Sequence, residues 1–347
     1  MKKKINVFLV LTEYQFLQAV NIATGVYQYD DYINIIYLVR NGHRLNGIDA
    51  KIPMAINNTT VEVLDDFPAA VISKKILGIM PDHFIIFQEG DALNTYLSYH
   101  LARRGTIISL GPDGYKIFAK FNKRLKFLSF INDTIKQNLY LFKKKLYSAK
   151  LHAFDYYSYG HSKFINNLWV THPEQYVHRA KNKVTISKLP DFSNECVEFI
   201  SKCFDFNKDF PLENVIYYFN QPLWGNLIAT DFKFIEEVLK HFPGKKLVVK
   251  LHPLTTTEVK LRFQELSNVT IIESAVPAEV LLLKLKNCIV FTGWSSVLIT
   301  ENKSCNYYFN YPIYLSLNDS RMNQLEIIAL KHIKMIYKSN EMKFPNL

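Results

Sequence analysis

The stretch KLVVKLHPLTTTEVKLRFQEL, residues 246–266, contains a complete strand-to-helix transition. Its apolar first half is typical of a buried strand, and Pro253 ends that strand because proline has no N–H to donate to a sheet. A helix is predicted from residue 256 to residue 266. Lys250 and His252 therefore lie at the rim of the sheet, where a cation and an imidazole suit a phosphate.

The alternation of strand and helix recurs along the whole chain. In the first half, strands are predicted at 4–11, 32–40, 59–66, 83–90 and 105–114, with helices at 12–28 and 91–103. Thr12 is the predicted N-cap of the first helix, with Gln15 at the capping-box position. In the second half, further strands at 214–220, 269–274 and 287–293 alternate with helices at 193–203, 229–241, 277–284 and one opening at 294. This alternation builds mostly parallel sheets with helices on both faces. The predicted fold class is α/β, with two Rossmann-like doubly wound domains.

The chain has 347 residues, which is too long for one ordinary core. A polar, proline-containing region at 172–192 predicts a passage between an N-terminal domain, 1–180, and a C-terminal domain, 181–347. In doubly wound sheets, ligands bind beyond the carboxyl ends of the strands. The candidate site residues of the second domain are therefore Gln221 with Pro222, Lys250 to Pro253, Glu273 to Glu279, and Gly293 to Ser296.

The chain carries 42 Lys+Arg against 31 Asp+Glu, a formal charge of +11, which favours an anionic partner. No apolar run reaches the roughly 18 residues of a membrane span. The apolar start ends at Thr12 and Glu13 without a small-residue cleavage site, so we interpret it as a strand and expect a cytoplasmic protein. The cysteines lack zinc or C-x-x-C spacing and are expected to be reduced and structural: Cys196, Cys203, Cys288 and Cys305.

Between residues 116 and 150 the positive charge is concentrated, and Asp133 is the acidic residue that opposes it. The segment 117–150 is predicted to be helical, and its charges are interleaved with Phe, Leu, Ile and Tyr, as in KFNKRLKFLSF. It indicates either a basic amphipathic element for an anionic inner-membrane surface or an ordinary solvated helix face. The basic residues are Lys116, Lys120, Lys123, Arg124, Lys126, Lys136, Lys143, Lys144, Lys145 and Lys150.

Two later motifs complete the candidate site. In TGWSSVL, Ser295 and Ser296 open the predicted helix, where they can bind an anion or cap the helix. In ESAVPAEVLL, Glu279 lies in the first turn of a helix, where it can bind ribose hydroxyls or serve the helix dipole.

Taken in order, the motifs resemble those of bacterial sialyltransferases of glycosyltransferase family 52. VPAEVLL places Glu279 27 positions after His252 (279 − 252), and WSSVL places Ser295 16 positions after Glu279 (295 − 279). The stretches LTEYQFLQA at 11–19 and FNQPLWG at 219–225 are also similar to that family. The resemblance implies a GT-B fold, a CMP-sialic acid donor, and inversion without a metal or other cofactor. It also implies a cell-surface glycan acceptor, in lipooligosaccharide or capsule, that ends in a galactoside.

The resemblance also implies roles for individual residues. His252, beside Pro253, would contact the departing CMP phosphate, and Ser295 and Ser296 would hold the same phosphate. Lys250 and Glu279 would lie against the cytidine base and ribose, and Gln221 would belong to the same donor site. The chain has no D-x-D motif for a divalent metal, which agrees with a metal-free reaction.

The general base of the family lies in an acidic-acidic-glycine motif of the first domain, and two segments compete for this position. SLGPDG offers Asp113 with Gly114, and IIFQEG offers Glu89 with Gly90. Neither matches fully, because proline or glutamine occupies the first acidic position. Asp113 is preferred, since it follows a strand directly before the basic region, although an Asp-Gly pair also forms plain tight turns.

Three functions stay open from the sequence. The first is the inverting transfer of sialic acid, with Asp113 as base and His252 assisting departure of CMP. The second is a CMP-Kdo or other CMP-nonulosonate transferase of the same fold. The third is a non-catalytic protein that binds anionic glycans or nucleic acid, although no nucleic-acid-binding module is visible in the sequence.

Overall fold

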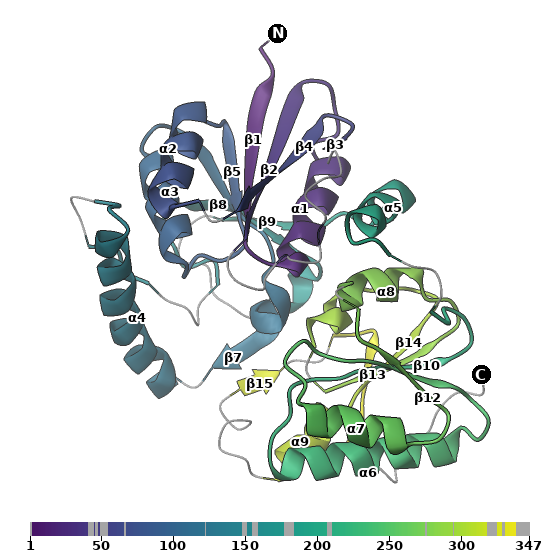
Figure 1. The fold of residues 1–347 in the computed structure, drawn as a ribbon. Coiled ribbons are helices and arrows are strands. Elements are labelled where there is room, and N and C mark those ends of the chain that lie inside the picture. Colours follow the sequence, from purple (N-terminus) through teal and green to yellow (C-terminus); the bar gives the residue numbers. More distant parts are fainter. Residues whose placement is uncertain are drawn as a thin grey trace. The chain divides into compact units, whose positions relative to one another are not determined.

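The computed structural model describes residues 2–40, 45, 48, 55–65, 67–121, 123–147, 151–154, 159–176, 184–206, 210–274, 276–293, 295–317, 325–327 and 330–337 (Figure 1). The chain divides into two compact units, Met1–Asp205, called unit 1, and Phe206–Leu347, called unit 2. Each unit contains its own largely parallel sheet. The predicted α/β class with two domains is confirmed.

Unit 1 contains an eight-stranded sheet in the order β3-β4-β2-β1-β5-β6-β8-β9. Its strands are β1 (Lys4–Val10), β2 (Tyr32–Arg40), β3 (Ala55–Ile56), β4 (Thr59–Asp65), β5 (His83–Ile86), β6 (Ile107–Leu110), β8 (Ile165–Val170) and β9 (Thr185–Lys188). Neighbouring strands are parallel except β3, which is antiparallel to β4. Because the chain adds strands first on one side of β1 and then on the other, the order reverses between β1 and β5.

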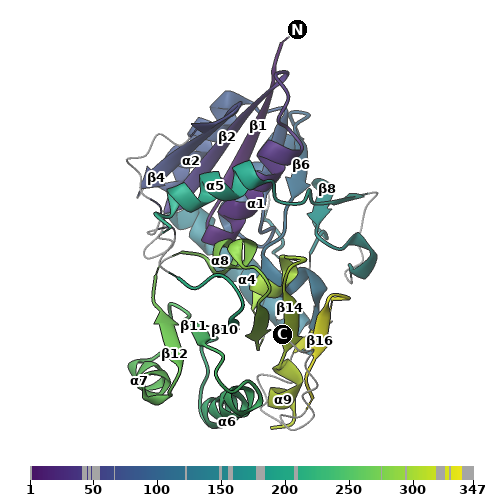
Figure 2. The ribbon, with the colours of Figure 1, turned by 90° about the vertical axis from the view of Figure 1, so that its right-hand side faces the viewer.

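Helices cover both faces of this sheet, with α1 and α5 on one face and α2 and α3 on the other (Figures 1 and 2). Thr12 caps α1 as predicted, and its side chain accepts a hydrogen bond from the Gln15 N–H at 3.3 Å. The further elements of unit 1 are α1 (Glu13–Gly25), α2 (Ala69–Ile79), α3 (Ala92–Ala102), η1 (Gly114–Phe118), β7 (Ala119–Phe121), α4 (Lys123–Lys143), η2 (Pro173–Gln175) and α5 (Asn194–Cys203).

Unit 2 contains a six-stranded parallel sheet in the order β12-β11-β10-β13-β14-β16. Its strands are β10 (Ile216–Phe219), β11 (Leu247–Lys250), β12 (Val269–Ile272), β13 (Ile289–Thr292), β14 (Asn306–Phe309) and β16 (Ile333–Met335), and β15 (Leu325–Ile327) lies outside this sheet. Its helices are α6 (Asn226–His241), α7 (Thr257–Glu265), α8 (Ala278–Lys284), η3 (Ser296–Ile299) and α9 (Tyr311–Leu315). One face carries α6, α7 and α9, and the other carries α8 (Figure 1).

The core of unit 2 lies between the sheet and α6 and α7. Phe232 and Phe263, from these two helices, lie with ring centroids 4.7 Å apart and belong to the same buried cluster as Val249 of β11. The central strands β10, β11 and β13 are four residues long and buried throughout, as expected for a parallel sheet covered on both faces. This packing fixes the strand ends, which carry the candidate site residues.

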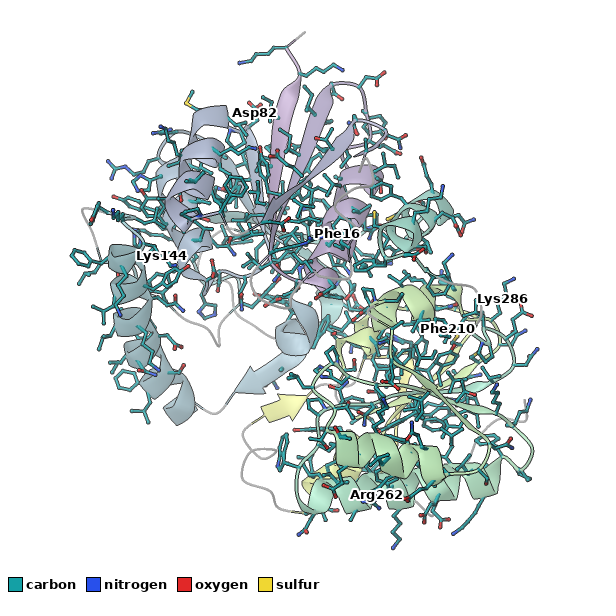
Figure 3. The ribbon with its side chains drawn as sticks, viewed as in Figure 1. Phe16, Asp82, Lys144, Phe210, Arg262 and Lys286 are labelled. Carbon is teal, nitrogen blue, oxygen red and sulfur yellow. The ribbon has the colours of Figure 1, made fainter. Side chains whose placement is uncertain are left out.

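The division between the units falls after Asp205, whereas the sequence predicted a boundary after residue 180. Segment 184–205 belongs to unit 1 because β9 pairs with β8 in parallel and α5 packs on α1. Phe16 of α1, labelled in Figure 3, forms an edge-to-face pair with Phe204 at the end of α5, with ring centroids 6.1 Å apart. β9 is an exposed strand at the edge of the sheet of unit 1, so the polar composition there does not mark the passage between the units.

Two predicted helices differ in the structure. The basic segment 117–150 is not helical throughout, because η1 and β7 precede α4. The helix expected to open at residue 294 is the four-residue 3-10 turn η3. Within the basic segment, Lys150 and the side chains of Lys116, Lys123, Arg124 and Lys126 lie outside the described residues.

Two further sequence-based expectations concern the membrane and the cysteines. Within the described ranges, no helix combines the length and the apolar character that crossing a bilayer requires. All four cysteines are free thiols; three of them are buried and Cys305 is partly exposed.

Candidate active site

The candidate site of unit 2 lies at the carboxyl end of its parallel sheet. The chain runs from β10 to β11 and β12 on one side and then returns to the other side of β10 with β13, so the order reverses between β10 and β13. Ligands of doubly wound sheets bind outside the strand ends at such a reversal. Asn220 and Gln221 follow β10, His252 follows β11, and Ser295 follows β13.

His252 is half-buried in the turn that ends β11. Its Nδ1 accepts a hydrogen bond from the Leu254 N–H at 3.1 Å, so the neutral ring carries its hydrogen on Nε2. Burial lowers the pKa of His252, and the charge of Lys250 lowers it further. The side chain thus presents one N–H donor near neutral pH, and an anion bound beside it would raise its pKa. Pro253 is exposed and follows the strand, which ends at Lys250.

Lys250 is a buried cation at the end of β11, with only 7% of its surface exposed. Burial lowers its pKa to about 8, and the carboxylate of Glu279 opposes this shift. Its Nζ donates to the carbonyl of Ser274 at 2.6 Å. A buried ammonium at a strand end is a functional-site candidate, since a purely structural role would be served by an uncharged side chain.

A hydrogen bond joins Glu279, in the first turn of α8, to Ser296, the first residue of η3. Ser296 Oγ donates to Glu279 Oε1 at 2.9 Å, and Glu279 is only 6% exposed. Ser295 Oγ accepts from the Val297 N–H at 3.3 Å, which leaves its hydroxyl hydrogen available to donate. Because η3 has only four residues, a helix dipole contributes little here. The Ser295 hydroxyl is the donor that an anion would meet, whereas Ser296 would first have to release Glu279.

These contacts bear on the nucleotide-binding roles implied for Lys250 and Glu279. Both side chains direct polar atoms at protein partners, at Ser274 and Ser296 respectively. A direct contact with a base or ribose would require either side chain to leave its partner. In the structure they support the strand-end loops and set the local charge.

Asn220 is a site residue that the sequence analysis did not single out. It is buried, its Oδ1 accepts from Thr255 Oγ1 at 2.7 Å, and its carbonyl accepts from Gln221 Nε2 at 3.1 Å. Its buried Nδ2 has no hydrogen-bond partner among the described residues. The sequence signal that could have identified Asn220 is its position directly after the apolar run IYYF. Lys250 and His252 were identified from a similar position at the end of an apolar run.

In unit 1, Asp113 follows β6 and is half-buried. Gln15 Nε2 donates to Asp113 Oδ1 at 2.8 Å, while Gln15 Oε1 accepts from the Leu11 N–H at 2.8 Å. Gln15 therefore connects the end of β1 to the carboxylate. The sequence predicted Gln15 only as a capping residue, because its link to Asp113 spans 98 residues.

Glu89, the competing base, is engaged in holding a loop. Its two carboxylate oxygens accept from the backbone N–H groups of His161 and Ser162, each at 3.2 Å. Nearby, burial raises the pKa of Tyr159 well above its usual value, and the charges of Asp113 and Glu89 add to the shift. The contacts of Glu89 favour a structural role and leave Asp113 as the better candidate.

Two glycines shape the turn that carries Asp113. Gly114 has a φ of 71°, in the left-handed region that favours glycine. At Gly111, a Cβ atom would lie 2.5 Å from the ring of Phe87, so only glycine fits the packing at this strand end. The Asp-Gly pair therefore forms a turn with a defined backbone requirement.

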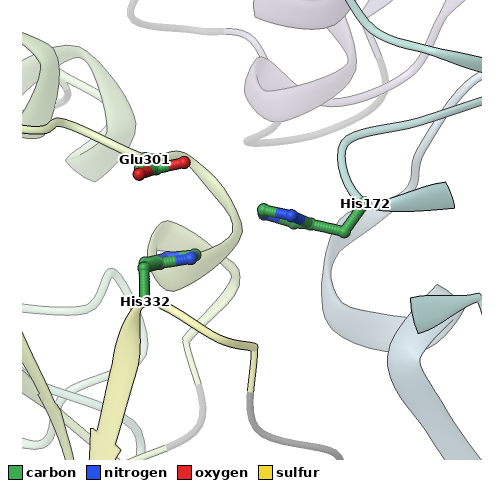
Figure 4. A group of neighbouring side chains, drawn as sticks. All are labelled: His172, Glu301 and His332. Carbon is green, nitrogen blue, oxygen red and sulfur yellow. The ribbon is translucent and has the colours of Figure 1, made fainter. Parts of the chain in front are cut away.

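His332 and Glu301 lie together in unit 2 (Figure 4). Nε2 of His332 lies 2.9 Å from the carbonyl of Leu298, and burial lowers the pKa of this histidine. His172, drawn in the same figure, belongs to unit 1, where its Nδ1 lies 3.7 Å from Glu174. Glu301 and His332 alone offer fewer than the three or four ligands of a usual protein metal site.

Comparison with known proteins gives likeness at the level of structure. No family model matches the sequence, and no curated protein matches it. A sialyltransferase from Photobacterium damselae, represented by its GT-B domain, is similar with a TM-score of 0.50 at 12% identity, covering 88% of this chain and 91% of that chain. Another structure of a sialyltransferase from Photobacterium damsela gives a TM-score of 0.52 at 14% identity, covering 89% of this chain and 75% of that chain. The predicted GT-B fold is confirmed, and membership of family 52 stays a prediction.

Proposed function

We propose that this protein is an inverting glycosyltransferase that moves sialic acid from CMP-sialic acid to a hydroxyl of a glycan acceptor. The GT-B fold, shared with proteins described as sialyltransferases, supports this class of reaction. The order of the motifs around His252, Glu279 and Ser295 supports the donor. The proposed acceptor is a galactoside-ended cell-surface glycan, in lipooligosaccharide or capsule.

The observation that carries the proposal is the state of His252. Its Nδ1 is occupied by the Leu254 N–H, so Nε2–H is the donor available to a ligand. Ser295 offers its hydroxyl after β13, at the same edge of the sheet, and Lys250 adds a buried positive charge. Ser296 would join them by exchanging its hydrogen bond to Glu279 for one to the phosphate. Together these groups suit a nucleoside monophosphate, which requires less neutralisation than a diphosphate.

In the proposed step, the acceptor hydroxyl attacks C2 of the sialyl group and transfers its proton to Asp113. The bond between C2 and the phosphate oxygen breaks, and CMP leaves with the electron pair. His252 donates its Nε2–H to the departing phosphate and stabilises the charge that develops there. Gln15 acts as a positioning residue, because it fixes one oxygen of Asp113 through a 2.8 Å hydrogen bond.

A CMP-Kdo transferase is the second candidate. The donor-site features described above all concern the nucleotide phosphate, so they do not distinguish between sialic acid and Kdo as the sugar. We propose to separate the two by incubating the protein with CMP-sialic acid or CMP-Kdo and a panel of galactosides, measuring CMP release and product mass. Release from neither donor would overturn both candidates and favour a binding protein. Chelation with EDTA should leave the rate unchanged; loss on chelation and recovery with manganese would refute the metal-free reaction.

His252→Ala should lower turnover by roughly a hundredfold, the usual loss when a general acid is removed. The matched control is His241→Ala at the exposed end of α6, which should keep full turnover. Both variants should give the circular dichroism spectrum of the wild type. A folded His252→Ala variant with an unaltered rate would remove this residue from the mechanism.

A further inference from the structure

One side of helix α4 makes polar contacts with segment 151–154 of the same unit. Asn138 Nδ2 donates to the carbonyl of His152 at 2.7 Å, and its Oδ1 accepts from the His152 N–H at 3.0 Å. One turn earlier, Thr134 Oγ1 accepts from the Phe154 N–H at 3.2 Å. Leu141 is buried on the same side. These contacts hold the helix against segment 151–154 largely by hydrogen bonds.

A second side of α4, about 90° around the helix from these contacts, is apolar and exposed to solvent. We call these residues the α4 stripe, and their exposed fractions are Leu128 56%, Ile131 44%, Ile135 57%, Leu139 55% and Phe142 67%. At 3.6 residues per turn, the five side chains fall within an arc of about 80°. A surface helix normally packs such a stripe against the core of the protein, whereas the α4 stripe faces solvent. Contiguous exposed apolar side chains of this kind mark an interaction surface.

Lysines border the α4 stripe. Lys136 and Lys143 project about 100° and 80° from Ile135 on the same side of the helix, by the angle per residue of an α-helix. Lys144 (Figure 3) and Lys145 follow directly, and all four lysines are exposed. The acidic residue of the helix, Asp133, lies toward the other side and accepts from Ser129 Oγ at 2.5 Å. The stripe is therefore bordered by positive charge without a nearby carboxylate among the described residues of α4.

We infer that the α4 stripe inserts into the interface of a membrane that contains anionic phospholipid. The apolar side chains enter the boundary between headgroups and acyl chains, while the lysine ammonium groups reach the phosphates. A second copy of this chain is the less suitable occupant, because a symmetric pairing through the stripe would bring lysines against lysines. The helix then lies along the membrane plane, and it does not cross the bilayer.

The test is co-sedimentation of the full chain with phosphatidylcholine vesicles, prepared with and without phosphatidylglycerol. At about 0.1 M salt, where charges act over roughly 10 Å, binding should be at least about tenfold stronger with the anionic lipid. Ile135→Ser with Leu139→Ser should lower that binding by about tenfold or more, since each change removes apolar carbons from the interface. Both residues are exposed, so the variant should keep the circular dichroism spectrum and melting temperature of the wild type.

Two controls separate insertion from simple charge attraction. Leu261→Ser, an exposed change on α7, should keep full binding. Replacing Lys143, Lys144 and Lys145 by Glu should abolish binding, whereas the same charge change at the exposed Lys233, Lys246 and Lys303 should reduce it far less.

Three results would overturn the inference. The wild type could ignore anionic vesicles at low salt, or the stripe variant could bind as well as the wild type. Alternatively, sedimentation velocity could show a wild-type dimer that the stripe variant converts to a monomer, which would assign the stripe to self-association. Because none of these measurements uses turnover, they are independent of the proposed reaction.

Discussion

Replacing Lys250 by methionine should stabilise the protein near neutral pH while weakening its donor site. The ammonium is buried, and its pKa falls from 10.5 to about 8 in the folded state. At 1.36 kcal/mol for each pKa unit, a shift of this size corresponds to a cost of about 3 kcal/mol for keeping the lysine charged. Methionine preserves most of the aliphatic volume and removes that cost.

The gain is reduced by the loss of two hydrogen bonds, of which the one to the Leu251 carbonyl is long, at 3.4 Å, and contributes little. Lys250 Nζ donates to the Ser274 carbonyl at 2.6 Å, and an unpaired carbonyl costs about 1 to 1.5 kcal/mol. The free energy of unfolding of Lys250→Met should therefore exceed that of the wild type by about 2 kcal/mol at pH 7. Folded Lys250 has the lower pKa, so its cost is fully present below pH 8 and disappears as the pH rises toward 10.5. The advantage of the variant should shrink over this range and vanish by about pH 10.

Urea unfolding at pH 7 and pH 10 measures both quantities. Lys246→Met, at an exposed position directly before the same strand, should change the free energy of unfolding by no more than about 0.5 kcal/mol at either pH. Calorimetry should show a weaker affinity of Lys250→Met for CMP, by roughly tenfold or more for a lost interaction with a charged group. A variant that is equally destabilised at pH 7 and pH 10 would refute the reasoning, because the buried charge would then impose no cost.

Two further outcomes follow from the contacts of the site. Binding of CMP near neutral pH should take up a fraction of a proton, because the phosphate opposes the burial that lowers the pKa of His252; calorimetry in two buffers of different ionisation enthalpy detects it, and identical heats would contradict it. Gln15→Met should lower kcat by roughly tenfold, as a small misplacement of the base can, with little change in the donor KM. Gln18→Met, at a buried neighbour on α1, is the matched control, and an equal loss there would show that only the packing of the helix had been disturbed.

The sequence by itself determined the local elements and their order. Apolar runs of strand length, separated by helical periodicity, predicted the strands and helices that form both sheets, because a buried parallel strand must be apolar on both faces. Thr12 was recognisable as the cap of α1, since capping depends on residues three positions apart. Pro253 predicted that the strand would not continue past this position, and β11 ends at Lys250. The placing of His252, Glu279 and Ser295 after strands of one sheet followed from this order.

Long-range packing decided the features that local patterns leave open. Segment 184–205 joins unit 1 because an edge strand and a helix find partners there, although its polar composition resembled a linker. The polar contacts of α4 with segment 151–154 leave its apolar side exposed, whereas periodicity alone would place that side in a core.

Electrostatics at the candidate site likewise required the tertiary structure. The sequence pattern places Lys250 at the end of a strand. Its burial, which lowers its pKa, depends on segments that pack around it in the fold, such as the one that carries Ser274. Gln15 and Asp113 meet across 98 residues because β1 and β6 end at the same edge of one sheet. Burial and contact arise when segments distant in the sequence pack together. The pattern along the chain therefore determines which side chains each segment carries, and only the fold decides which groups those side chains contact.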